Sequence, residues 1–135
     1  VRPLGYGTKA FDLGSHGKIV PVAISNPEHL NLSAYAVLGD DKNLYLTIIN
    51  MEHGENARDA RIFPDKVNIH GAQVLSLTAP DHDIAATSGE TLGGGEIKNN
   101  GTWNGKWTTL PMNELGVFAV AVPAASAVII KLSAN

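Results

Sequence analysis

The sequence predicts an all-β protein: an antiparallel two-sheet β-sandwich of about eight strands, of Greek-key type, with a short helical segment at its N-terminus. Short β-rich runs recur along the chain, and turn signals separate them about every 8–12 residues, which is typical of a sandwich or barrel. Alternation within the runs gives each strand one apolar face, as two packed antiparallel sheets require.

The N-terminal segment 1–14 is expected to be helical because Pro3 stands where a first helical turn would begin. The stretch 14–17 (Gly-Ser-His-Gly) then breaks the helix, and we expect the sandwich to occupy residues 15–135. The predicted strands cover residues 19–24, 32–38, 44–51, 67–70, 74–79, 95–98, 106–110, 117–122 and 127–132.

Two of these runs alternate clearly. Leu44, Leu46 and Ile48 share one face of their run, opposite Tyr45, Thr47 and Ile49. Val128, Ile130 and Leu132 likewise share a face opposite Lys131. We expect each run to pack one of its faces against the other sheet.

Turn residues predict how the strands are joined. The stretch 40–43 (Asp-Asp-Lys-Asn) predicts a tight hairpin, and the stretch 80–83 (Pro-Asp-His-Asp) closes the fifth run. Asn104-Gly105 predicts a type I′ turn, which would place Trp103 and Trp107 on opposite faces of a ribbon. Residues 83–95 are expected to form a long surface loop.

Composition excludes several classes of protein. The 135 residues suggest one domain, with 44% hydrophobic and 17% charged residues, as in ordinary globular proteins. The longest apolar run, residues 117–122, is far too short to cross a bilayer. A net charge of −3 without a basic stripe argues against nucleic-acid binding. The chain has no cysteine, which excludes disulfides and thiol chemistry.

Paired carboxylates are the first candidates for chemistry, because glycoside hydrolysis uses two of them flanking the scissile bond. Glu52 and Glu55 surround His53, and Asp81 and Asp83 surround a second histidine. Nothing nearby predicts the apolar pocket that raises the pKa of a catalytic acid. We therefore interpret them as solvated loop charges and expect no catalytic residue.

Metal, cofactor and modification signals are weak. The histidines stand at positions 16, 29, 53, 70 and 82 without a recognised ligand spacing, so we expect no metal site. Gly93-Gly94-Gly95 lacks the Lys-Ser/Thr of a phosphate loop and is read as a loop or bulge, so no cofactor is expected. Asn31 and Asn100 begin glycosylation sequons, which matter only in a host that glycosylates.

The two tryptophans, Trp103 and Trp107, carry the strongest hypothesis of binding. They could pack in the core or at an interface, or one could contribute to an aromatic platform for a sugar. Tyr6 and Phe11 of the opening segment are further candidates for carbohydrate or interface contacts.

Several stretches together resemble the C-terminal β-domain of glycoside hydrolase family 79, the β-glucuronidase and heparanase-like enzymes. The match covers most of the chain in short pieces, and similar sandwiches follow the barrels of families 30, 39 and 51. The matching stretches are Arg2-Pro3-Leu4-Gly5-Tyr6-Gly7, residues 19–22, 32–37, 44–50 and 92–97, Gly101-Thr102-Trp103, and residues 122–128.

The resemblance implies that segment 1–14 is similar to the last helix of a preceding (β/α)8 barrel. The chain would then be a non-catalytic accessory domain that supports this barrel, in a retaining, glucuronidase-like parent that is secreted or periplasmic. Without the barrel, the helix would fold back on the sandwich or pair with another copy through Tyr6 and Phe11. Two alternatives stay open: an autonomous carbohydrate-binding module, and an immunoglobulin-like surface interaction domain.

Overall fold

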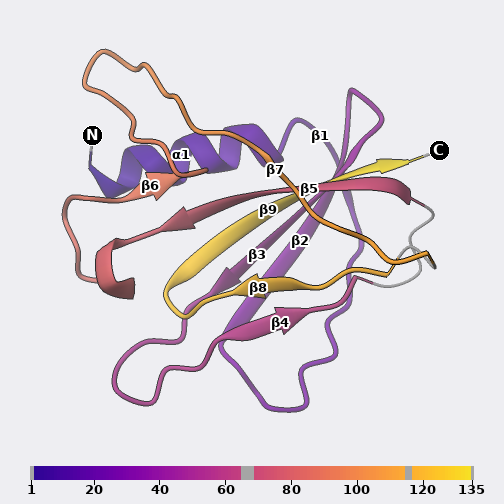
Figure 1. Cartoon of the computed structure of the whole chain (residues 1–135), viewed down its shortest axis with the longest axis horizontal. Coiled ribbons are helices and arrows are strands. Elements are labelled where there is room, and N and C mark those ends of the chain that lie inside the picture. The colour runs from indigo at the N-terminus through magenta and orange to yellow at the C-terminus, as the bar shows by residue number, and fades with distance from the viewer. Residues whose placement is uncertain (1, 65–68, 115–116, 135) are drawn as a thin grey trace.

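The computed structural model describes residues 2–64, 69–114 and 117–134, and it is mostly β (Figure 1). Its elements are α1 (Pro3–Gly14), β1 (Gly17–Val20), β2 (Leu32–Gly39), β3 (Leu44–Asn50), β4 (Ala60–Ile62), β5 (Ile69–Thr78), the short 3₁₀ helix η1 (Pro80–His82), β6 (Thr91–Leu92), β7 (Thr108–Thr109), β8 (Val120–Val122) and β9 (Ser126–Ala134).

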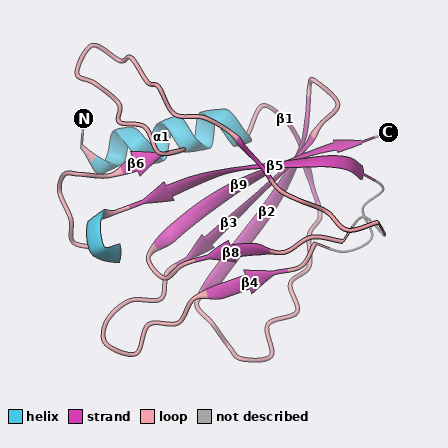
Figure 2. Ribbon diagram, in the orientation of Figure 1, coloured by secondary structure: helices cyan, strands magenta, loops and turns pink. Residues whose placement is uncertain are grey.

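The larger sheet is antiparallel and has the order β1-β2-β3-β9-β5-β6, with β7 also pairing with β5. The last strand, β9, lies between β3 and β5, so the order in the sheet differs from the order in the chain. Strands β4 and β8 form a separate two-stranded sheet (Figure 2). The predicted antiparallel all-β class is therefore confirmed.

The hairpin between β2 and β3 forms where the turn residues predict it. The backbone N–H of Gly39 donates to Asn43 O at 2.8 Å, and Lys42 takes a positive φ of 71°. The carboxylate of Asp41 accepts the Asn43 N–H at 3.0 Å, as in an Asx turn. This local hydrogen bonding fixes the register of the two strands.

One face of the large sheet packs against the two-stranded sheet. Ile48 of β3 and Ile130 of β9 belong to the same buried cluster as Val120 and Val122 of β8. The alternation predicted for residues 44–49 and 127–132 is confirmed, because Leu44, Leu46, Ile48, Val128, Ile130 and Leu132 all contribute to this cluster.

The opposite face of the large sheet carries α1. The helix begins after Arg2 with Pro3 in its first turn, as predicted. Tyr6 is buried with Leu75, Leu92 and Ile129 in a second cluster, and Ala10 and Leu13 of the helix pack beside it. Because β3 and β9 are covered on both faces, they form the centre of the fold. Among the described residues, no helix is long and apolar enough to span a membrane.

The predicted type I′ turn at Asn104-Gly105 is wrong, because neither residue has a positive φ. Trp103 instead forms an isolated bridge with Ile97, and the N–H of Lys106 donates to Gly93 O at 3.0 Å. The segment thus packs against the turn at residues 93–95 rather than pairing with itself. Tertiary packing has overridden the local hairpin preference.

Other strand boundaries differ from prediction where runs are short. The run 19–24 is a strand only to Val20, the run 106–110 only at β7, and the run 117–122 only from Val120. The run 95–98 forms only isolated bridges, and β4 was not predicted. The run 74–79 belongs to β5, while residues 67 and 68 of the fourth predicted strand lie outside the described residues.

Candidate functional site

The carboxylate of Glu52 joins two loops. It accepts a hydrogen bond from Arg58 Nε at 2.8 Å and another from the Asn31 N–H at 3.2 Å. Arg58 also donates to the carbonyl of Glu28 at 3.0 Å. The hydrogen bond from Arg58 lowers the pKa of Glu52, the opposite of what a catalytic acid needs. The carboxylate of Glu52 therefore links two loops through hydrogen bonds. The nearby Glu55 is exposed.

The second acidic segment is exposed as well. Asp81, His82 and Asp83 lie on and just after η1, where Asp81 and His82 take φ values of 53° and 54°. Asp83 Oδ1 accepts the N–H of Ala85 at 2.9 Å and so closes its own loop. Within residues 2–64, 69–114 and 117–134, no group of three metal-ligating side chains comes together.

Both tryptophans lie on the α1 side of the large sheet, where they pack against the second cluster. Trp103 Nε1 donates to Leu92 O at 2.9 Å, and Lys9 Nζ lies 5.5 Å from its ring centroid. Trp107 meets Tyr45 edge-on, with ring centroids 6.3 Å apart. These contacts give both half-buried indoles a role in packing, and sugar binding by them stays a prediction.

Tyr6 and Phe11 lie on different sides of α1. Tyr6 is 4% exposed, and its hydroxyl accepts the N–H of Ile97 at 2.9 Å, which ties the helix to the loop after β6. Phe11 is 63% exposed and lies outside both core clusters. The helix folds back on its own sandwich, which is one of the two expected outcomes, and buries Tyr6; pairing with another copy stays a prediction.

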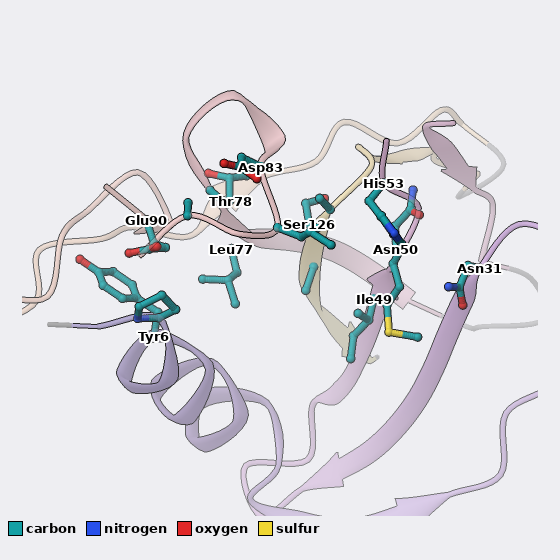
Figure 3. A pocket seen from close by; sticks show the side chains of 17 residues that line it. Tyr6, Asn31, Ile49, Asn50, His53, Leu77, Thr78, Asp83, Glu90 and Ser126 are labelled. Carbon is teal, nitrogen blue, oxygen red and sulfur yellow. The ribbon is translucent and has the colours of Figure 1, made fainter. Parts of the chain in front are cut away.

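A mostly apolar pocket of about 510 Å³ opens between the start of α1 and the ends of β3, β5 and β9. Figure 3 shows Tyr6 and Glu90 at one end of this pocket, with Asn31 and His53 at the other. Glu90, just before β6, is only 5% exposed. Neither of its carboxylate oxygens has a hydrogen-bond partner among the described residues.

Glu90 carries no signal in the sequence. It follows Ser88 and Gly89 in a polar loop, so it reads as one more solvated carboxylate. Its burial arises from the way this loop returns to pair β6 with the end of β5 while α1 lies alongside. Contacts between segments so far apart in the chain leave no local pattern.

The fold recurs within solved glycoside hydrolases. An arabinofuranosidase matches 98% of this chain at a TM-score of 0.66 and 16% identity, over 29% of its own length. A 4-O-α-L-rhamnosyl-β-D-glucuronidase from Fusarium oxysporum matches 84% of the chain at a TM-score of 0.57 and 18% identity, over 26% of its length. The catalytic domain of the GH30 xylanase C from Talaromyces cellulolyticus matches 85% at a TM-score of 0.54 and 12% identity, over 20% of its length.

No protein-family model matches the sequence, and no curated protein matches it. The structural matches have identities low enough that they show a shared fold alone. In each case this chain spans less than a third of the matching protein. The chain therefore has the fold of a β-rich part of several much longer glycoside hydrolases.

Proposed function

We propose that this chain is a non-catalytic accessory β-domain of a glycoside hydrolase, and that it packs against and supports a catalytic (β/α)8 barrel outside the chain. One observation carries the proposal: the fold matches cover 84–98% of this chain but only 20–29% of the glycoside hydrolases concerned. A domain that accompanies a larger catalytic unit would give this asymmetry. On this proposal, α1 is the junction segment 1–14 and residues 15–135 are the accessory sandwich.

The candidate carboxylates support a non-catalytic role. Glycoside hydrolysis needs two carboxyl groups about 5–9 Å apart across a bound sugar. Glu52 is held by Arg58, whereas Glu55, Asp81 and Asp83 are exposed on loops. Asp83 lines the same pocket as the buried Glu90, but Asp83 is exposed and its Oδ1 accepts the N–H of Ala85. On this proposal the acid and the nucleophile come from the barrel.

The outward side of α1 is the surface we assign to the barrel. Leu4 is 83% exposed and Phe11 is 63% exposed. Their spacing of seven residues places them on one side of the helix, away from Tyr6 and Ala10 in the core. A helix with apolar residues on two sides is typical of one that is buried on both.

The finer identity that we propose for the parent is a retaining, glucuronidase-like enzyme of family 79. The stretches at 2–7, 92–97 and 101–103 support this choice by their resemblance to that family. The likeness to the Fusarium glucuronidase agrees with it, although an arabinofuranosidase and a xylanase share the fold too. The alternative of an autonomous sugar-binding module has less support, since Trp103 and Trp107 are held by internal contacts.

An activity assay tests the proposal. The purified 135-residue chain should not hydrolyse aryl β-glucuronides, xylosides or arabinofuranosides, whereas the polypeptide extended by the region encoded upstream of Val1 should hydrolyse one of them. Turnover by the chain alone, abolished by Glu52→Gln or Glu55→Gln, would contradict the non-catalytic role. An upstream region with no barrel-length catalytic domain would contradict the accessory role.

A further inference from the structure

Among the described residues, the carboxylate of Glu90 is a buried charged group without a hydrogen-bond partner. A carboxyl group removed from water without a hydrogen-bond partner is costly, and buried charges are normally paired. Glu90 is more than nine-tenths buried, and both of its oxygens lack a partner among the described residues. The carboxylate lines the end of the pocket formed by the first turns of α1, where Pro3 and Tyr6 form part of the wall (Figure 3).

Two polar side chains of the pocket wall are already engaged within the fold. Asn50 donates through Nδ2 to the carbonyls of Arg58 and Val122, at 3.1 and 3.0 Å, and its Oδ1 accepts the Glu52 N–H. Ser126 Oγ donates to a backbone carbonyl at 2.6 Å.

The hydroxyl of Thr78 and the imidazole of His53, which also line the pocket, have partners within the fold as well. Thr78 Oγ1 lies 3.1 Å from Thr91 Oγ1, and His53 Nδ1 lies 3.1 Å from Met51 O. A sugar carries many hydroxyl groups and would need several free partners. Asn31 and Asp83 also line the pocket, but both residues are exposed. Among the lining residues, Glu90 is the deeply buried one whose two acceptor oxygens lack a partner, and the walls around it are mostly apolar.

We propose that the pocket receives an arginine side chain, whose guanidinium group pairs with both oxygens of Glu90. A planar guanidinium suits two-point binding of a carboxylate, and its methylene stem suits apolar walls. The source of this arginine rests on the proposed function: it belongs to the catalytic barrel, because the pocket lies beside the start of α1, where a preceding domain would connect. Glu90 is then the anchor that orients barrel and sandwich.

The test uses n-butylguanidinium as the probe on the 135-residue chain, with butylurea as its neutral isostere. We expect the cation to shift the NMR signals of Tyr6, Glu90 and Ala127, and butylurea to leave them unchanged. Glu90→Gln should weaken binding about tenfold or more, since the charge-assisted pair is lost. The matched control Glu55→Gln removes an exposed carboxylate outside the pocket and should leave the affinity unchanged.

Equal binding of butylurea, or unchanged binding of the cation to a folded Glu90→Gln variant, would overturn the proposal. Shifts of the same signals caused by glucuronate or xylose, but not by the cation, would overturn it in favour of a sugar site. Glu90→Met gives a second measurement, because removing an unpaired buried carboxylate should raise the Tm of the isolated chain, and a lower Tm would count against the proposal. These experiments use the 135-residue chain alone. The arginine proposal can therefore fail even if the upstream region is a catalytic barrel, and it can succeed even if that region is not.

Discussion

At the scale of single residues, Gly105 shows how close packing can replace a turn preference. The residue does not take the positive φ that a type I′ turn needs. It is nevertheless a position for glycine, because a Cβ built on it would overlap Leu92 O and the ring of Trp103. Glycine is needed here for the close approach of two segments.

Gly105→Ala should therefore lower the free energy of unfolding by about 1–3 kcal/mol, as overpacking of a filled site does. The matched control is Gly7→Ala in α1, where a Cβ would meet nothing within 4 Å. That change should raise stability by about 0.5–1 kcal/mol through helix propensity. Urea unfolding of both variants provides the check, and a neutral Gly105→Ala would show that the segment can move away.

The hydrogen-bonded pair of Tyr45 and Asp41 makes the free energy of unfolding depend on pH in the alkaline range. Burial, together with the 2.6 Å hydrogen bond to Asp41, raises the pKa of Tyr45 to about 12 from its ordinary value of 10.0. A group with a raised folded-state pKa stabilises the protein fully below its unfolded pKa. This contribution should be complete below about pH 10 and lost as the pH rises through about 12.

Tyr45→Phe should remove this dependence. Unfolding of both proteins by urea between pH 8 and pH 12 measures it. The stability of wild type relative to the variant should fall across the upper part of this range. A difference that is constant with pH would mean that the tyrosine titrates equally in the folded and unfolded states.

At the scale of elements, α1 is held by one deeply buried side chain. Tyr6→Ala should cost about 3–5 kcal/mol, because it leaves a cavity among Leu75, Leu92 and Ile129. Phe11→Ala, on the exposed side of the same helix, should change the stability of the isolated chain by less than about 0.5 kcal/mol. Thermal unfolding compares the two, and equal effects would mean that the helix does not pack in the register described here.

Prediction from the sequence succeeded where strands are long and alternate strictly. The sequence pattern places Ile48 and Ile130 on the apolar faces of their strands, and the structure buries both in the same cluster. This agreement arises because every second side chain of a strand points to the same face of the sheet. It failed at β4 and β6, since strands of two or three residues carry too little pattern to detect. It also failed at Asn104-Gly105, where the partner of the segment is the distant turn at residues 93–95.

At the scale of the whole molecule, the general role could be proposed from sequence, but the pocket could not. The stretches at 2–7 and 92–97 predict a junction and an accessory sandwich by their resemblance to family 79. Glu90 depends on where α1, β5 and the loop before β6 meet, and that is a property of the folded chain. Leu4 and Phe11 on the outward face of α1 have no apolar cover in the described structure, and this is the surface that we assign to the barrel.

The most direct test of the account is the effect of Phe11→Asp on Tm in two proteins: the isolated chain and the chain extended by its upstream region. Phe63→Asp is the matched control, since Phe63 is 62% exposed and follows β4 in the small sheet that covers the opposite face of the large sheet. The account predicts that Phe11→Asp leaves the Tm of the isolated chain unchanged and lowers that of the extended protein by several degrees, while Phe63→Asp affects neither. An extended protein that tolerates Phe11→Asp as well as the isolated chain does would contradict the claim that this domain packs on a barrel through α1.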